Sequence, residues 1–395
     1  MPVEFLIFGA TLAGVALFHR HAFAIAAAGL AAIVAWEWAV TSFPTGPGLD
    51  GLAAHLAREW VVLANLALLL VGFAVLAGHF EESGLPRALP AFLPDDWTGA
   101  LMLLGIVFVA SAFLDNIAAA LIGGATAQTL FRGRVRVGYL VAIVAAANAG
   151  GAGSVIGDTT TTMMWISGVA PAEVLHAYVA SAVAFLVFAI PAAWSQQRFA
   201  PILKEAGANL AVDWPRVAIV GVILASAVAV NVGINASAPS LSERFPLIGA
   251  TVALATLLTS AWRRPNLGVL PDAVKGALFL MCLVASASLM PVDSLAPASW
   301  RSTLALGFVS AFFDNIPLTA LALRQGGYDW GMLAFAVGFG GSILWFGSSA
   351  GVAIGNMFPE ARSTSRWLAE GWWVALAYVA GIAALIGLLG WNPGD

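Results

Sequence analysis

Long apolar runs separated by short polar loops recur along this chain from one end to the other. A run of about 20 apolar residues is the length that crosses a lipid bilayer as a helix. We therefore predict a membrane-spanning helix wherever such a run is continuous. The predicted spans cover residues 3–18, 22–42, 60–80, 174–193, 214–233, 246–262, 272–290 and 367–390.

Four further apolar regions are interrupted near their middle. Polar pairs break two of them: Asp115-Asn116 lies within residues 97–131, and Asp314-Asn315 lies within residues 297–323. Glycine-rich sequence breaks the other two, residues 137–167 and 330–357. A polar pair or a cluster of glycines weakens a helix at that point, so we predict broken rather than continuous helices there.

The interruptions occur in the same order in both halves of the chain. Asp115 and Asp314 lie 199 residues apart, and a set of glycines recurs at an offset of 190 residues. These are Gly150, Gly151 and Gly157 in one copy and Gly340, Gly341 and Gly347 in the other. A constant offset indicates an internal repeat. We predict two repeats, residues 1–205 and 206–395, with the hairpins at 97–131 and 297–323 and the broken helices at 137–167 and 330–357.

The length of the segments that contain the polar pairs favours re-entrant hairpins. Two complete spans would need about 40 apolar residues, and residues 97–131 supply only 35. Asp and Asn are preferred helix N-caps, so each pair would cap the second half-helix of its hairpin. Pro317 suits the first turn of the half-helix that would follow Asp314.

The arrangement of positive charges predicts the orientation. If the hairpins do not cross, each repeat has five crossings, and an odd number turns the second repeat upside down. Placing the N-terminus outside leaves only Arg58, Arg244, Arg301 and Arg324 of the 17 Lys and Arg residues outside, as the positive-inside rule requires. The predicted fold is an all-α polytopic membrane protein with two inverted repeats of five transmembrane helices, an architecture of secondary transporters.

Composition supports a membrane location. The chain is 61% hydrophobic and 10% charged, whereas soluble domains carry about 25% charged residues. The N-terminal run has no preceding basic residues of the kind that mark a cleavable signal, so we expect it to be the first span. No basic patch with interleaved aromatic residues is present, which excludes nucleic acid as an expected partner. The single cysteine, Cys282, supplies neither a disulfide framework nor a metal cluster.

Three aspartates at predicted membrane depth are the main candidates for chemistry. A charged Asp near the bilayer centre costs about 2.5–3.5 kcal/mol on insertion scales. Asp115, Asp158 and Asp314 therefore need burial away from lipid, a bound cation or a proton. Carboxylate, amide, hydroxyl and backbone carbonyl oxygens are hard donors, which hard cations such as sodium prefer.

We predict two related ion sites, one in each repeat. The first combines Asp115, Asn116, Asp158 and Thr159, and the second combines Asp314, Asn315, Ser348 and Ser349. Carbonyl groups freed near Gly153, Gly157 and Gly347 would add ligands, because unwound backbone at membrane depth must line a cavity. The first site has one more carboxylate, so we expect sodium to bind at Asp115, Asn116 and Asp158.

A purely structural interpretation of these residues is also open. The Asp-Asn pairs would then only cap half-helices, and the glycines would only permit close packing. Threonine hydroxyls of the run 159–162 would bond back to the preceding turn, as they often do in membrane helices. We prefer the ion sites because the combination of polar pair and glycine break occurs twice.

The motifs of both repeats resemble those of the ion transporter superfamily. The stretch NAGGAGSVIGDTTTTMMWI, residues 148–166, is similar to the pattern GGA-x-x-x-IGD-x-TTTM-x-WI of the NhaD-type sodium/proton antiporters. The resemblance covers about residues 97–167 and 297–358, and the LDN and FDN tips fit the same superfamily. It implies exchange of sodium or lithium for protons across a bacterial inner membrane by a homodimer with an elevator-like transport part. It also implies the two ligand sets given above and no cofactor.

The sequence departs from this family in two respects. The chain is shorter than expected for the subfamily, and its second break carries Trp345 and no acid. Citrate and dicarboxylate carriers of the superfamily have neutral Ser-Asn-Thr tips, where this chain has Asp-Asn.

Several functions remain open on the sequence. The first is cation/proton antiport, in which one carboxylate binds either sodium or a proton. The alternative is a sodium-coupled carrier of a carboxylate or another oxyanion, attracted by half-helix N-termini. Arsenite efflux has no thiol site to support it, and the catalytic motifs HExxH and GxSxG are absent from the sequence, so an enzyme is not expected.

Overall fold

The computed structural model of the chain describes residues 2–18, 21–88, 92–202, 211–237, 241, 244–313 and 315–394. Asp314, a predicted ligand of the second site, lies outside these residues. Within them, every regular element is a helix, apart from an isolated bridge between Phe43 and Gly46. The helices form two compact units, each assembled from separate stretches of the chain.

The first unit comprises Met1–His79, Val217–Pro297 and Ile316–Gly326. Its helices are α1 (Val3–Leu17), α2 (Ala22–Ala39), α3 (Gly48–Glu82), α11 (Trp214–Ser237), α13 (Leu247–Thr259), α14 (Leu270–Ser288) and, from its second residue on, α16 (Asn315–Gln325). Two 3-10 turns, Leu267–Val269 and Val292–Ser294, flank α14. Within this unit, α2 packs against both α1 and α14.

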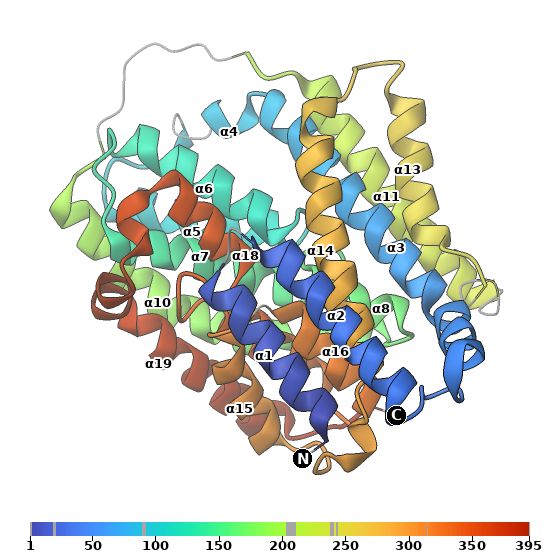
Figure 1. Cartoon of the computed structure of the whole chain (residues 1–395). Coiled ribbons are helices and arrows are strands. Elements are labelled where there is room, and N and C mark those ends of the chain that lie inside the picture. The colour runs from blue at the N-terminus through green and yellow to red at the C-terminus, as the bar shows by residue number, and fades with distance from the viewer. Residues whose placement is uncertain are drawn as a thin grey trace. The chain divides into compact units, whose positions relative to one another are not determined.

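The second unit comprises Phe80–Arg216, Ala298–Asn315 and Gly327–Asp395. Its helices are α4 (Leu85–Ala88), α5 (Trp97–Ser111), α6 (Asn116–Leu130), α7 (Val137–Ala152), α8 (Thr159–Ile166), α9 (Pro171–Leu175), α10 (Ala177–Phe199), α15 (Trp300–Ser310), α17 (Trp330–Gly340), α18 (Ser349–Met357) and α19 (Thr364–Leu389), with a 3-10 turn at Pro359–Arg362. In this unit α10 lies along α19 and α7 (Figure 1).

Helices α7 and α17 form the core of the second unit. Every residue of both helices is buried, because both are apolar or small nearly all round, with Asn148 of α7 as the strongly polar exception, and so have no face suited to water. Helix α5 packs on α7, and α15 packs on α17. The first halves of the two glycine-broken segments, α7 and α17, are thus the most buried helices of this unit.

The predicted interruptions are present. The segment 97–131 forms two helices, α5 and α6, and the segment 137–167 forms α7 and α8. The corresponding segments of the second half form α15 with α16 and α17 with α18. A broken segment thus exists in each place where the sequence predicted one.

The third predicted span differs most from the observed helix. We expected it at residues 60–80, whereas α3 extends over Gly48–Glu82. Its first twelve residues contain Asp50, His55, Arg58 and Glu59, which lower the local hydropathy without preventing helix formation. A prediction from apolar length alone therefore starts this helix too late.

Five helical stretches among the described residues are long and apolar enough to cross a membrane. They are Ala22–Ala39, Gly48–Glu82, Pro171–Phe199, Leu267–Ser288 and Thr364–Leu389. Several shorter helices, including α5 and α7, are equally apolar. This length and composition fit a multi-pass membrane protein.

Candidate ion-binding site

The polar pair between α5 and α6 begins the second helix of its segment. Asp115 is the N-cap of α6, and its Oδ2 accepts a hydrogen bond from the backbone N–H of Ile117 at 3.2 Å. Asn116 is the first residue of α6, and Asn315 is the first residue of α16. The predicted capping position of the first Asp is confirmed.

Each glycine-rich break also ends in a capped helix. Asp158 caps α8, and its Oδ1 accepts from the Thr160 N–H at 3.0 Å. Ser348 caps α18, and its hydroxyl accepts from the Gly351 N–H at 3.2 Å. Both capping side chains are 2% exposed, so each capped helix begins inside the protein.

The repeated glycines lie where two backbones meet. A Cβ on Gly157 would collide with the Ser111 carbonyl oxygen, and a Cβ on Gly347 would collide with the Ala311 carbonyl oxygen. The preceding turns are also matched, because Ser111 Oγ donates to the Ala147 carbonyl and Ser310 Oγ donates to the Val337 carbonyl, each at 2.6 Å. The repeated sequence therefore makes repeated contacts, in which only glycine fits at the break.

Neutral amides from two different segments meet the Asp158 carboxylate. Asn116 Nδ2 donates to Asp158 Oδ2 at 3.3 Å. Asn315 Nδ2 lies 3.5 Å from Oδ1 and 3.4 Å from Oδ2 of the same carboxylate. The Asp-Asn pairs of both halves thus contribute an asparagine to one acid.

Asn148 extends this network to the second glycine break. Its Oδ1 accepts from Asn116 Nδ2 at 3.1 Å, and its Nδ2 donates to Ser342 Oγ at 2.9 Å and to Ser348 Oγ at 3.1 Å. We call Asn116, Asn148, Asp158, Asn315, Ser342 and Ser348 the polar cluster. All six residues belong to the second unit, and each is at most 6% exposed.

The carboxylates of the cluster region influence each other. Asp115 is partly exposed, and its negative charge interacts unfavourably with that of Asp158. The described hydrogen-bond donors to both carboxylates are neutral groups. An ionised carboxylate in the interior is costly unless it is paired or solvated, so this region has the electrostatic character that favours a bound cation or a proton.

The threonines that follow Asp158 differ in their hydrogen bonding. Thr161 and Thr162 donate to the Asp158 carbonyl at 2.9 Å and also bond the carbonyls of Ser154 and Val155 in the break. These bonds match the structural alternative and hold the unwound backbone in place. Thr160 is fully buried, and its hydroxyl has no hydrogen-bond partner within the described part of the chain.

The remaining predicted residues lie at the edge of the cluster. Thr159 and Ser349 are the first residues of α8 and α18, and both are partly exposed. Gly153 ends α7 and faces the ring of Tyr178.

Asn148 and Ser342 were not among the predicted site residues. Asn148 is the only strongly polar residue within the buried helix α7. A single amide in an otherwise apolar run could have been recognised from the sequence as a candidate site residue. Ser342 carried no comparable signal, because its role depends on Asn148 reaching it from another helix. Over the described residues, no group of three or more His, Cys, Asp and Glu side chains is placed to hold a metal ion.

The chain is similar to proteins named as sodium/proton antiporters, although no protein-family model matches it. It is 32% identical over 335 residues to sodium/proton antiporter 1 of Arabidopsis thaliana, covering 72% of this chain but only 55% of that protein. It is 27% identical over 384 residues to the Na⁺/H⁺ antiporter NhaD of Vibrio parahaemolyticus, covering 82% of this chain and 90% of that protein.

A second bacterial relative gives the same result. The Na⁺/H⁺ antiporter NhaD of Alkalimonas amylolytica is 25% identical over 418 residues, covering 91% of this chain and 83% of that protein. These relatives are named as transporters and not as enzymes. Together with the IGD-x-TTTM motif around the buried Asp158, they show that the chain is related to the NhaD-type sodium/proton antiporters.

Proposed function

We propose that this protein is a secondary active transporter that exchanges sodium or lithium ions for protons by alternating access. The observation that carries the proposal is the buried Asp158 carboxylate, which receives amide groups from both Asp-Asn segments. The relatives named as Na⁺/H⁺ antiporters support the same activity.

The exchange rests on competition at one carboxylate. Asp158 balances its buried charge either by binding a sodium ion or by binding a proton, and the two cannot occupy the same oxygens together. The amide groups of Asn116 and Asn315 present an oxygen to a cation after rotation about the last side-chain bond, since an amide carries a donor and an acceptor. Exposure of the loaded site to one side at a time then links the two fluxes.

The proposed ligands include residues beyond the polar cluster. Asp115 adds a second carboxylate, and Thr159 adds a hydroxyl next to Asp158. The second set consists of Asp314, Asn315, Ser348 and Ser349, of which Asn315 and Ser348 belong to the cluster and Asp314 lies outside the described residues. Carbonyls near Gly153, Gly157 and Gly347 complete the proposed donor set.

The proposal also includes the architecture predicted from the sequence. Helices α5 and α6 have 15 residues each, a length of about 22 Å, which is shorter than the roughly 30 Å hydrocarbon core of a bilayer. This supports a re-entrant hairpin, and the matched contacts of the two glycine breaks support two repeats. We propose that the repeats are inverted, that the N-terminus lies outside a bacterial inner membrane, and that the protein is a homodimer with an elevator-like movement.

Reconstituted transport tests the function directly. The full chain is placed in proteoliposomes with an acidic lumen and a pH-sensitive dye. Addition of sodium or lithium without any organic anion should release protons and restore fluorescence. If added sodium or lithium releases no protons, and labelled citrate or succinate is instead taken up in the presence of sodium, the protein is not an antiporter. It would then be a sodium-coupled carboxylate carrier. None of the relatives above is named as such a carrier.

A further inference from the structure

One face of α10 forms part of an apolar groove in the second unit, away from the polar cluster. The groove has a volume of about 590 Å³ and is lined by Leu186, Ile190 and Trp194 of α10, with Trp97 of α5 and Trp373 of α19. Leu186, Ile190 and Trp194 are 59%, 42% and 49% exposed. Residues three or four apart share one side of a helix, so this side of α10 is an open apolar stripe.

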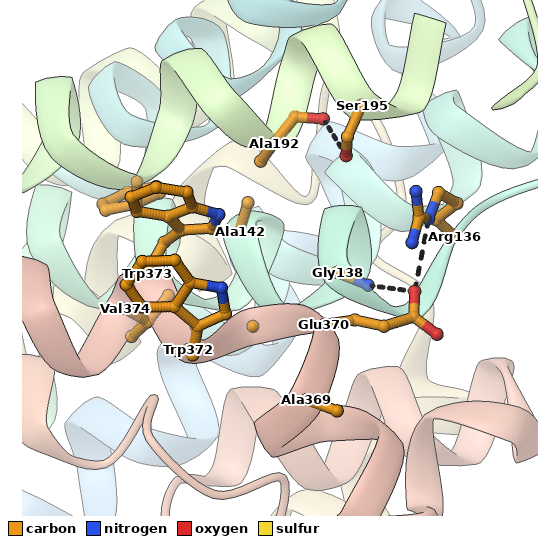
Figure 2. A pocket seen from close by; sticks show the side chains of 12 residues that line it. Arg136, Gly138, Ala142, Ala192, Ser195, Ala369, Glu370, Trp372, Trp373 and Val374 are labelled. Carbon is orange, nitrogen blue, oxygen red and sulfur yellow. Dashed lines mark hydrogen bonds and ion pairs between the residues drawn. The ribbon is translucent and has the colours of Figure 1, made fainter. Parts of the chain in front are cut away.

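A second, polar pocket adjoins the groove at Trp373. It has a volume of about 190 Å³ and lies between α7, α10 and α19. Figure 2 shows Trp372 and Trp373 at one end of this pocket and Arg136 with Glu370 at the other. The apolar groove therefore leads, through a pair of stacked tryptophans, to a charged end.

Arg136 lines the charged end of the pocket, and two more arginines, Arg134 and Arg198, lie beside the last turns of α10. The guanidinium of Arg198 stacks on Trp194, 3.6 Å from the ring centroid. The guanidinium groups of Arg134 and Arg136 lie 5.3 and 5.9 Å from the ring centroid of Phe199. Gln196 fixes this arrangement, because its side chain bonds the Arg134 carbonyl at 3.0 Å and the Arg136 N–H at 2.8 Å.

The positive charge at this end is only partly compensated. Arg136 pairs with Glu370 at 3.3 Å, and the same carboxylate accepts from the Gly138 N–H at 3.3 Å. Asp96, next to Trp97, is occupied in capping α5. Within the described residues neither Arg134 nor Arg198 has an ion pair with an acidic side chain. The Arg134 guanidinium donates to the neutral Phe199 carbonyl at 3.4 Å, so the charges of both arginines remain without an acidic partner.

We propose that the groove and the pocket bind one anionic phospholipid. Its acyl chain would lie along Ile190 and Trp194, and its phosphate would face Arg134, Arg136 and Arg198. Arginines pair strongly with phosphate oxygens, and basic pockets between membrane helices bind acidic lipid head groups. Tryptophans beside arginines are typical of the level where lipid head groups lie. This inference does not depend on which ion the protein transports.

A lipid fits this surface better than a second copy of the chain. The surface combines an open apolar groove with a basic end, which matches the two chemically different parts of one phospholipid. A self-complementary protein interface of this kind would place the arginines of one copy against an acidic patch. The acidic residues at this end are Glu370, Asp96 and Asp95, which contacts Gln197 through its carbonyl oxygen, and each of them already has an interaction partner.

Lipid titration of the purified, delipidated full chain in detergent tests the proposal. The readout is the thermal unfolding midpoint, because a ligand that binds the folded state raises it with concentration. We expect phosphatidylglycerol to stabilise the protein at lower concentration than phosphatidylcholine with the same acyl chains. Inorganic phosphate should not substitute, since it lacks the acyl chain that fills the groove.

Two variants and a matched control locate the effect. Arg198→Gln should weaken the apparent affinity for phosphatidylglycerol about fivefold, and Arg134→Gln with Arg198→Gln should weaken it further, by roughly 25-fold in total. Arg301→Gln serves as the control, because Arg301 also stacks on a tryptophan, Trp300 at 5.2 Å, but on α15. The midpoint without lipid shows whether each variant is folded.

Three results would overturn the proposal. They are equal stabilisation by the two lipids, an unchanged affinity in a folded Arg198→Gln protein, and an equal loss in Arg301→Gln. If the double variant does not fold, the single Arg198→Gln variant decides, because Arg198 is exposed and its described contact is the stack on Trp194.

Discussion

Asp158 combines an observed structural role with a proposed chemical one. It caps α8 with one carboxylate oxygen and receives asparagine amides from two segments. The capping function needs only an acceptor, which Asn also provides. The proposed ion exchange needs a charge that can be balanced by either sodium or a proton, which Asn does not provide.

We therefore expect Asp158→Asn to fold but not to exchange ions. Its stability should stay within about 1 kcal/mol of the original, because Asn is an equally good N-cap. Sodium-dependent proton release in proteoliposomes should fall to background. Asp96→Asn is the matched control, since Asp96 also caps a helix but is exposed, and it should retain transport. Full activity of Asp158→Asn with unchanged apparent sodium affinity would remove Asp158 from the site.

Asn148 connects the two glycine breaks, and its removal should affect both stability and affinity. Asn148→Ala leaves Ser342 and Ser348 without the donor they share, and buried polar groups left unsatisfied cost about 1–3 kcal/mol each. We expect a lower thermal midpoint and a weaker apparent affinity for sodium, because Asn116 loses the acceptor that orients its amide.

A buried asparagine in the other unit separates these two effects. Asn65 is 2% exposed, and its Oδ1 accepts from the Gly249 N–H at 3.0 Å. Asn65→Ala should lower the midpoint by a comparable amount and leave the sodium affinity unchanged. An equal loss of sodium affinity in both variants would mean that Asn148 acts through general stability alone.

At the scale of helices, capping residues and glycines set the positions of the breaks. Asp115, Asp158 and Ser348 each cap a helix that begins inside the second unit. The local sequence predicted the first of these helix starts, because capping depends on residues two or three positions apart, whereas Asp158 and Ser348 were predicted as ion ligands and not as caps. The helix lengths were less predictable, since α3 includes polar turns that its apolar run did not cover.

The glycines of the breaks should not tolerate a methyl group. Gly157→Ala places a Cβ against the Ser111 carbonyl, and Gly347→Ala does the same at Ala311. Overpacking of this kind costs about 1–3 kcal/mol. We expect both variants to unfold at lower temperature and to lose transport, because the backbone near the cluster must move.

Gly276→Ala, within helix α14, should raise the stability of the protein, whereas the substitutions at the breaks should lower it. A Cβ at Gly276 of α14 meets no atom within 4 Å, so the substitution should stabilise the protein by about 0.5–1 kcal/mol through better helix propensity. Transport should be unchanged. If Gly157→Ala were as stable as Gly276→Ala, close backbone packing would not be the reason for glycine at the break.

At the scale of the whole molecule, the proposed inversion of the repeats makes a prediction about sidedness. Thr129 lies near the end of α6, and Ala296 precedes α15; both are exposed. In a Cys282→Ser background, Thr129→Cys should react with a membrane-impermeant maleimide only from the cytoplasmic side. Ala296→Cys should react only from the opposite side, because an odd number of crossings inverts the second repeat.

Labelling of right-side-out and inside-out vesicles distinguishes the alternatives. Reaction of both cysteines from the same side would contradict inverted repeats, even if transport is normal. Reaction of each cysteine from the side opposite to that predicted would keep the inversion but reverse the placement of the N-terminus. Each variant should first be shown to transport ions, so that the labelling reports on a folded protein.

The sequence by itself determined where the helices are broken, the cap at Asp115 and the repeat of glycines, because capping and close packing depend on residue types at fixed spacing. Only the tertiary structure decided which polar groups meet. It joined residues of both predicted ligand sets in one cluster and added Asn148 and Ser342. These partners are separated by up to 200 positions, and their contact depends on how the buried helices α7 and α17 pack, which no local pattern specifies.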